Sequence, residues 1–250
     1  MSTMRLDRLL SNLGYGSRKE IALCARAGRI ALSGTVIKKA DQNVLLADAA
    51  SGALTFDGER IDPPAPLTVM LNKPRGYICS HDEKGMLVYD LLPPRWQTRK
   101  PALSSAGRLD KDSTGQVILT DDGDLLHRII HPKSHAAKYY AVTLEHALRG
   151  DESALFATGT FLMNGDMKPL KSAFWIAEGD KNGRMILHEG RFHQIRRMFE
   201  TIGNRVVALH RYQTGSLRLM DLNLGEYRIL GNVDIQSIFP ASESVVSCST

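Results

Sequence analysis

The sequence predicts an α+β fold in which a small N-terminal α+β unit precedes a larger domain with a mixed, mostly antiparallel sheet flanked by helices. Amphipathic helical stripes alternate with short apolar strands, and a proline cluster interrupts this pattern at residues 63–66. Proline has no N–H for strand pairing and stiffens the backbone. We therefore expect a first domain at residues 1–62, a linker at 63–66 and a second domain at 67–250.

The first domain is expected to open with two helices. The apolar stripe that predicts the first helix consists of Leu6, Leu9, Leu10 and Leu13. Ser17 and Glu20 form the capping-box pattern of a second helix, which ends at Gly28. Short strands are expected at residues 29–37, as two strands joined by a tight turn, at 43–46, and on either side of the hairpin signal Asp57-Gly58.

The second domain alternates predicted strands and helices. The expected strands lie at residues 67–71, 117–120, 139–144, 185–187 and 206–209. The expected helices carry two apolar stripes, namely Leu125, Leu126, Ile129 and Ile130, and then Ile195, Met198, Phe199 and Ile202. Pro132 bounds the first helix, and Gly203-Asn204 ends the second.

The composition is that of a globular protein. Of the 250 residues, 43% are hydrophobic and 24% are charged. No apolar run approaches the roughly 18 residues that cross a bilayer, and the N-terminus lacks the apolar core of a secretory signal. The three cysteines lie far apart, which suits a reducing compartment. We expect a cytoplasmic protein, and nothing in the sequence demands more than a monomer.

Positive charge is concentrated in two stretches of the chain. The whole chain has a net charge of +5 and a pI of about 9.1. Residues 1–40 hold eight Lys or Arg against Asp7 and Glu20, which gives a local charge of +6. Residues 191–211 hold five arginines against Glu200. Each stretch is either a solvated face or a surface that contacts phosphates.

Two glycines bracket a polar loop at Gly107–Gly115, just before a predicted strand. This composition suits a sharply bent loop that presents a side chain into a cleft. Asp110 and Asp112 are its candidate nucleophiles or bases. The alternative is a polar surface loop with Asx-turns, and Asp112 fits such a local structural role.

A second constellation spans residues 189–198, where Arg196 and Arg197 follow the inward-facing Ile195. An arginine here can reach a carboxylate, and others can reach phosphates. The alternative is a helix with ordinary solvated arginines.

Two further patterns fall short of a metal site. His127, His131 and His135 recur every four residues, but Pro132 interrupts their helix. The aspartates around Gly123 lack the spacing and the closing Glu of a calcium loop. We expect no metal and no cofactor.

The two loops together resemble the pseudouridine synthases, in the small-subunit (RsuA-type) branch. That family's central loop reads Gly-Arg-Leu-Asp, two variable residues, Ser or Thr, one variable residue and Gly, then four apolar residues and a hydroxyl residue. Gly107–Thr120 matches it, except that Gln116 occupies the first apolar position. Lys138–Tyr140 matches the family's Lys-x-Tyr strand, and Gly190–Phe199 matches its third motif. Residues 1–62 resemble the S4-type RNA-binding module that precedes the catalytic domain in this branch.

The resemblance implies that Asp110 is the catalytic carboxylate of a uridine isomerisation. Asp110 either attacks the ribose or removes a ribose proton, and the sequence leaves both roles open. Arg196 would pair with Asp110 and favour its ionised form. Tyr140 would stack on the uracil and take part in removal of the C5 proton. Arg108 would help to hold the nucleotide flipped out of its helix.

The charge pattern and the resemblance also indicate which side chains contact RNA. Few aromatic residues accompany the N-terminal cations, so we expect recognition of the RNA backbone there. A charged hairpin tip is an equal alternative for Lys73 and Arg75. The expected RNA contacts are Arg5, Arg18, Lys19, Arg26, Arg29, Lys73, Arg75, Arg191, Arg197 and Arg211.

The activity implied by the resemblance is isomerisation of a uridine to pseudouridine in small-subunit (16S) ribosomal RNA, as free RNA or in a ribonucleoprotein assembly intermediate. A large-subunit (23S) synthase is the alternative within the family. A non-catalytic rRNA-binding assembly factor is the alternative outside it, and a nucleoside glycosidase, which would release free uracil, is a third. Replacing Asp110 with Asn separates an enzyme from a binding factor, because it should abolish product and leave RNA affinity nearly unchanged.

Overall fold

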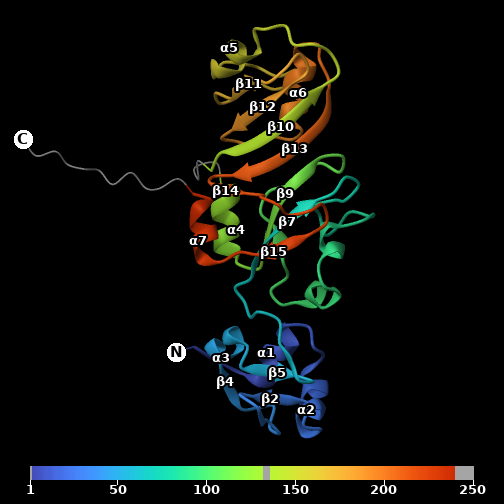
Figure 1. Cartoon of the computed structure of the whole chain (residues 1–250), viewed down its shortest axis with the longest axis vertical. Helices are drawn as coiled ribbons and strands as arrows, with labels where there is room; N and C mark the ends of the chain where they lie inside the picture. Colours follow the sequence, from blue (N-terminus) through green and yellow to red (C-terminus); the bar gives the residue numbers. More distant parts are fainter. Residues whose placement is uncertain (1, 132–135, 240–250) are drawn as a thin grey trace, which may run out of the picture. The chain divides into compact units, whose positions relative to one another are not determined.

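The structure is a computed structural model that describes residues 2–131 and 136–239. The chain divides into two compact units (Figure 1). Unit 1 comprises the described residues of Met1–Thr68, Val88–Ser105 and Leu119–Leu126, and unit 2 comprises those of Val69–Leu87, Ala106–Ile118 and His127–Thr250.

The N-terminal part of unit 1 combines three helices with two small sheets. The helices are α1 (Leu6–Asn12), α2 (Arg18–Arg26) and α3 (Leu46–Ser51). The strands are β1 (Thr3–Arg5), β2 (Ile30–Leu32), β3 (Thr35–Val36), β4 (Asn43–Leu45), β5 (Leu54–Phe56) and β6 (Glu59–Arg60). Strand β1 pairs with β4, and the other four form an antiparallel sheet in the order β3-β2-β5-β6.

Local sequence signals explain most of these elements. The predicted leucine stripe is confirmed, because Leu6, Leu9, Leu10 and Leu13 are all buried in one apolar core. The capping box is confirmed as well, since Ser17 N–H donates to Glu20 Oε2 at 2.7 Å and Glu20 N–H donates to Ser17 Oγ at 3.3 Å. Helix α3 was not predicted, because it is short and alanine-rich and shows no apolar stripe.

Unit 1 also contains chain that lies beyond the predicted N-terminal domain. Residues 88–105 form the 3₁₀ helices η1 (Val88–Leu91) and η2 (Pro94–Thr98) and the strand β8 (Ser104–Ser105). Lys100 N–H donates to the carbonyl of Asn12 at 2.8 Å, which joins this segment to α1. Unit 1 is thus larger than residues 1–62, and the proposed linker at 63–66 stays a prediction.

A nine-stranded mixed sheet forms the centre of the second half of the chain. Its order is β11-β12-β10-β13-β9-β7-β15, with β14 attached to β13 and β8 attached to β9. The strands are β7 (Thr68–Lys73), β9 (Thr114–Thr120), β10 (Lys138–Leu144), β11 (Phe174–Ala177), β12 (Asn182–Leu187), β13 (Val206–Thr214), β14 (Leu217–Arg218) and β15 (Tyr227–Ile229). Strand β13 pairs antiparallel with β10 and parallel with β9, so the predicted mixed α+β fold is confirmed.

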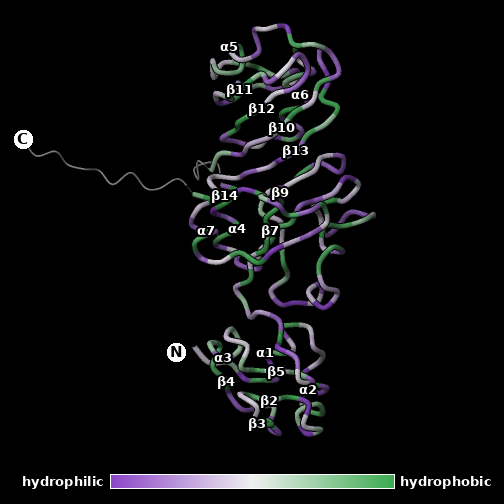
Figure 2. The backbone as a smooth tube through the Cα atoms, viewed as in Figure 1, coloured by the Kyte–Doolittle hydropathy of each residue, from purple (hydrophilic) through white to green (hydrophobic). Residues whose placement is uncertain are grey.

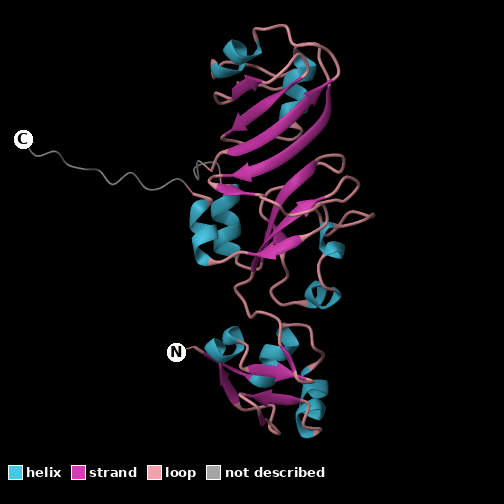
Figure 3. Ribbon diagram, in the orientation of Figure 1, coloured by secondary structure: helices cyan, strands magenta, loops and turns pink. Residues whose placement is uncertain are grey.

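Helices flank this sheet, as Figure 3 shows. They are α4 (Gly123–Ile130), α5 (Glu152–Ala157), α6 (Gln194–Thr201) and α7 (Asn232–Ser237). Helix α6 packs against β13 through an apolar stripe that includes the buried Ile195, Met198 and Phe199. Strand β7 is buried along its whole length, and Figure 2 shows its hydrophobic centre. None of the described helices has the length and apolar character that crossing a membrane requires.

Candidate active site

The glycine-bracketed loop at residues 107–115 leads into β9. Gly107 (φ 88°) and Gly115 (φ 109°) both adopt the left-handed backbone region that favours glycine. A Cβ atom on Gly115 would lie 2.2 Å from the carbonyl oxygen of Arg211. Glycine is therefore required where β9 pairs with β13. Within the loop, Ser113 N–H donates to the carbonyl of Asp110 at 3.0 Å and closes a turn.

Arg196 of α6 holds the Asp110 carboxylate. Its Nε lies 3.3 Å from Asp110 Oδ2, and its Nη2 donates to Ser113 Oγ at 3.2 Å. Its Nη1 donates to the carbonyl of Val206 at 3.1 Å, so one guanidinium joins helix, loop and strand. The Asp110 and Arg196 side chains are 25% and 20% exposed, which limits screening of the pair. The expected pairing is present, and the catalytic roles stay a prediction.

Asp112 contacts the same guanidinium from the solvent side. Its Oδ1 lies 3.0 Å from Arg196 Nη2, and its side chain is 48% exposed. Asp110 is more recessed than Asp112, although they are two residues apart. This difference favours Asp110 as the reacting carboxylate and Asp112 as a local support.

His193 is the second partner of Asp110, and the sequence analysis did not single it out as a site residue. Its Nε2 lies 3.3 Å from Asp110 Oδ1, so each carboxylate oxygen has its own partner. His193 is the N-cap of α6 and has a left-handed backbone (φ 48°, ψ 34°). The third motif contains His193, but the turn that directs its imidazole to Asp110 has no local sequence signal.

Tyr140 lies on β10, two strands from the end of the loop. It pairs with Arg211 of β13, and Arg211 pairs with Gly115 of β9. Neighbouring strands are about 4.8 Å apart, which places the backbones of Tyr140 and Gly115 about 10 Å apart. The Tyr140 side chain is buried. The structure therefore places Tyr140 in the same row of the sheet as the exit of the loop.

Lys138 shares a strand face with Tyr140, because the two residues are two positions apart on β10. Burial, and after it the like charge of Arg211, lowers the pKa of Lys138 to about 8. Arg211 is itself buried, and its Nε donates to the carbonyl of Gln116 at 2.7 Å. Two cations, the partly buried Lys138 and the buried Arg211, therefore lie beside Tyr140 on the sheet.

Two of the expected RNA contacts are corrected by the structure, because both side chains lie inside the protein. Lys73 is 0% exposed and Arg211 is 4% exposed, so neither meets a phosphate at the surface. Lys73 Nζ donates to the carbonyls of Pro74, Lys111 and Ser113, at 3.1, 3.3 and 2.6 Å. Burial lowers the pKa of Lys73. Lys73 thus ties the end of β7 to the Asp110 loop, a tertiary role that its sequence neighbours do not reveal.

Arg191 and Arg197 share the carboxylate of Asp166. Arg191 Nη1 lies 2.9 Å from Asp166 Oδ2, and Arg197 Nη2 pairs with Asp166 Oδ1. Hydrogen bonds from these arginines lower the pKa of Asp166. The contacts fasten the segment before β11 to the start of α6. RNA contact by Arg191 and Arg197 stays a prediction.

The N-terminal cations lie at the surface of unit 1. Lys19 and Arg26 are exposed on α2, and no described carboxylate pairs with either. They are seven residues apart and therefore lie on one face of the helix. Arg5 and Arg18 both pair with the buried carboxylate of Asp7, at 2.9 Å each.

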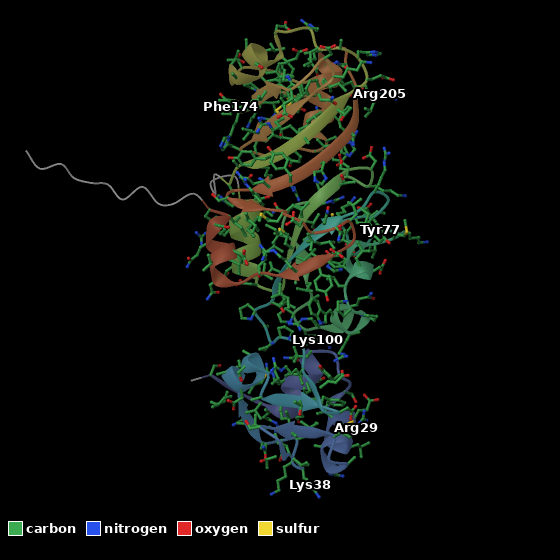
Figure 4. The ribbon with its side chains drawn as sticks, in the orientation of Figure 1. Arg29, Lys38, Tyr77, Lys100, Phe174 and Arg205 are labelled. Atoms are coloured by element: carbon green, nitrogen blue, oxygen red, sulfur yellow. The ribbon has the colours of Figure 1, made fainter. Side chains whose placement is uncertain are left out.

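The remaining exposed arginines of the predicted set are Arg29, Arg75 and Arg108. Arg29, which Figure 4 labels, precedes β2 and pairs with Asp57 in the turn between β5 and β6. Arg75 is exposed in the turn after β7. Arg108 is 66% exposed, and its Nη2 lies 3.1 Å from Glu83. Arg108 therefore lies at the surface, near the start of the loop that carries Asp110.

Comparison with known proteins places this site in a family. The family model described as RNA pseudouridylate synthase matches residues 68–201, which include Asp110, Tyr140 and Arg196. The chain belongs to the RNA pseudouridylate synthase family. The ribosomal small subunit pseudouridine synthase A of Yersinia pestis is 38% identical over 239 residues, which cover 94% of this chain and 98% of that protein. The protein of the same name from Escherichia coli (strain K12) is 36% identical over 240 residues, which cover 94% of this chain and 100% of that protein.

A crystal structure of a pseudouridylate synthase supports the same assignment. It aligns with a TM-score of 0.65 at 34% identity and covers 94% of this chain and 99% of that one. In this pseudouridylate synthase, Gln116 departs from the family's apolar pattern and is fully buried. Its Nε2 donates to the carbonyl of Leu217 at 2.9 Å, so the amide takes part in packing behind the loop.

The sequence contains two metal-like patterns, the aspartates around Gly123 and the series His127, His131 and His135. Asp122 Oδ1 accepts hydrogen bonds from the N–H groups of Asp124 and Leu125, both at 3.0 Å, which is a helix N-terminal turn. His135 and Pro132 lie outside the described residues. No group of three His, Cys, Asp or Glu side chains in the described part of the chain is placed to hold a metal ion.

Proposed function

We propose that this pseudouridylate synthase isomerises one uridine of small-subunit ribosomal RNA and that Asp110 is its catalytic carboxylate. The observation that carries the proposal is the Asp110–Arg196 ion pair at 3.3 Å, which joins the loop before β9 to helix α6. The small-subunit substrate is supported by the names of the relatives from Yersinia pestis and Escherichia coli, which align with 94% of this chain.

The reaction needs rearrangement of bonds and no change in oxidation state. The C1′–N1 bond of uridine breaks, the uracil turns, and C5 bonds to C1′. The C5 proton then leaves to solvent, and N1 carries a proton in the product. A positioned carboxylate, a surface that holds the base and exclusion of water suffice for these steps.

Each side chain of the site has a proposed role in these steps. Asp110 acts on the ribose, with Oδ2 anchored by Arg196 so that the carboxylate stays ionised and oriented. Tyr140 stacks on the uracil and assists removal of the C5 proton. Arg108, exposed at the start of the loop, helps to hold the flipped nucleotide.

The surrounding surface and the substrate complete the proposal. Exposed Lys19 and Arg26 on α2 contact RNA phosphates and position the enzyme on its substrate. The substrate is small-subunit RNA, either free or in a ribonucleoprotein assembly intermediate. The enzyme acts as a monomer in the cytoplasm.

Tritium release from C5-labelled RNA tests this function. The wild type and Asp110→Asn are incubated with small-subunit and large-subunit rRNA transcripts, with and without ribosomal proteins. Carbodiimide-dependent reverse-transcription stops then map the product. We expect the wild type to release tritium from small-subunit RNA at one mapped uridine. We expect Asp110→Asn to release none and to bind the RNA with affinity within about threefold of the wild type.

The other outcomes distinguish the alternatives. Release only from large-subunit RNA contradicts the proposed substrate and keeps the chemistry. Free uracil among the products indicates a glycosidase. Tight binding without release by the wild type indicates an assembly factor. Loss of RNA binding in Asp110→Asn removes the support for Asp110 as a purely chemical group.

A further inference from the structure

An exposed aromatic ring lies one residue away from the second partner of Asp110. Phe192 is 75% exposed, although it belongs to the most hydrophobic residue types. Its ring is stacked on the imidazole of His193, with centroids 3.8 Å apart and planes inclined by 17°. His193 Nε2 in turn lies 3.3 Å from Asp110 Oδ1. A stacked ring pair therefore ends in a polar contact with the Asp110 carboxylate.

The arrangement depends on a backbone conformation at His193 that is energetically unfavourable. His193 has φ 48°, a region that residues other than glycine seldom adopt. Hydrogen bonds stabilise the turn before and after His193. Gln194 Oε1 accepts from Arg191 N–H at 2.8 Å, and His193 O accepts from Arg197 N–H at 2.9 Å. The strained turn directs His193 towards Asp110 and leaves both His193 and Phe192 exposed, so it does not serve core packing. This geometry suits a Phe192 ring that contacts a ligand.

The chemistry around Phe192 selects a nucleobase as that ligand. One face of the ring rests on His193, and its high exposure leaves the rest of the ring open to a flat partner. Exposed Arg75, Arg108 and Lys111 lie on the loops that carry or adjoin Asp110, and they favour a polyanion over an apolar peptide. When a uridine leaves its stack to reach Asp110, the neighbouring base loses a stacking partner.

We propose that Phe192 is the stacking platform for an unpaired nucleobase next to the target uridine, and that this stacking holds His193 against Asp110. The inference rests on the proposed function, since it assumes that RNA reaches Asp110. Aromatic side chains stack on bases with little sequence preference, so the site recognises the open base and not its identity.

Three substitutions at Phe192 test the proposal. Phe192→Ala and Phe192→Leu remove the ring, and Leu keeps much of the apolar volume. Phe192→Trp keeps a larger ring. We expect the Kd for substrate RNA to rise about tenfold in the Ala and Leu variants and to stay within about threefold of the wild type in the Trp variant. Because Phe192 is exposed, these variants should fold normally.

The Trp variant also gives a direct signature of stacking. The two native tryptophans, Trp96 and Trp175, are both buried, so an added exposed Trp dominates the response to RNA. We expect RNA to quench its fluorescence, and an oligonucleotide with an abasic position beside the target uridine to quench it less.

Phe174→Ala is the matched control. Phe174 is also an exposed phenylalanine beside a histidine, with its ring 6.3 Å from that of His188. It lies on β11, four strands from β9, or about 19 Å by strand spacing. We expect the Phe174→Ala variant to bind substrate RNA with the same Kd as the wild type.

Unchanged affinity in Phe192→Ala, or absence of quenching in Phe192→Trp, overturns the stacking proposal. Equal losses in Phe192→Ala and Phe174→Ala also overturn it, because they indicate a general effect of removing a surface ring. Tritium release by the wild type is measured in the same samples. If the wild type releases none, the proposed function fails independently of the result at Phe192.

Discussion

The cations around Asp110 and two cations of helix α2, Lys19 and Arg26, differ in what neutralises them. Arg196 is 20% exposed and contacts the carboxylates of Asp110 and Asp112. Lys19 and Arg26 are exposed, and no carboxylate of the described chain pairs with them. Both groups are simply basic stretches in the sequence. A basic stretch can therefore contain arginines that pair with carboxylates, such as Arg196, and cations without such a partner in the described chain, such as Lys19 and Arg26. We propose that the first kind orients Asp110 and that the second kind binds RNA.

Removing the interior charge at Arg196 should have the largest effect. Arg196→Met deletes the partner of Asp110 Oδ2 and the donor to Ser113 Oγ. We expect kcat to fall about 100-fold, as when a preorganised electrostatic partner is lost, with little change in RNA affinity. Tritium release at saturating RNA, together with equilibrium binding, measures the two effects separately.

The neighbouring Arg197 provides the control for that prediction. Arg197 pairs with Asp166 and donates to the carbonyl of Asn164, and neither contact involves Asp110. Arg197→Met should therefore lower the melting temperature and leave kcat within about threefold of the wild type. Equal losses of kcat in the two variants would contradict the separate roles of these adjacent arginines.

Lys138 tests the energetic consequence of partly burying a cation on the sheet. Its folded-state pKa of about 8 is below that of an unfolded lysine, so below pH 8 the charged form destabilises the fold. This destabilisation, about 3 kcal/mol at most, is relieved as pH rises from 8 to about 10.4. We expect Lys138→Met to have the higher free energy of unfolding at pH 7, with the difference shrinking as pH rises through that window.

Chemical denaturation at a series of pH values measures this difference. Lys168→Met is the control, because Lys168 is exposed and its removal should leave the pH dependence of the wild type unchanged. A constant difference between Lys138→Met and the wild type from pH 7 to pH 10 would show that burial does not perturb Lys138.

Neutralising the surface cations should have the smallest effect on catalysis. Lys19→Gln combined with Arg26→Gln should weaken RNA binding and reduce the slope of log K against log salt concentration by about 2, one for each lost phosphate contact. The control is Arg184→Gln, which neutralises an exposed arginine on β12 that already pairs with Glu178. An unchanged salt slope in the double variant would remove α2 from the RNA interface.

Elements with strong local signals could be predicted from the sequence. The leucine stripe of α1 and the Ser17 capping box depend on residues within one or two turns, and both are present. The glycine-bracketed loop was also recognisable, because two positive-φ positions within nine residues call for glycine. The short edge strand β11 was missed, because it has only four residues and only Trp175 among them is buried.

The rest of the site depends on contacts between distant parts of the chain. Lys73 follows an apolar strand and was expected at the surface, yet the carbonyls of the Asp110 loop surround its ammonium. In the sequence, His193 stood out only as one residue of the third motif. A left-handed backbone turn sets the direction of its side chain, and no local sequence signal indicates that turn. Tertiary acceptors and backbone strain of this kind leave no periodic pattern in the sequence.

The most direct test of the separation between chemistry and binding is the single-turnover rate of tritium release at saturating RNA. It is measured for Asp110→Asn and for the Lys19→Gln, Arg26→Gln double variant beside the wild type. We predict no detectable release from Asp110→Asn at any RNA concentration. We predict a wild-type rate from the double variant once higher RNA concentrations compensate for its weaker binding. A near-normal rate in Asp110→Asn, or a slow rate in the saturated double variant, would contradict the account.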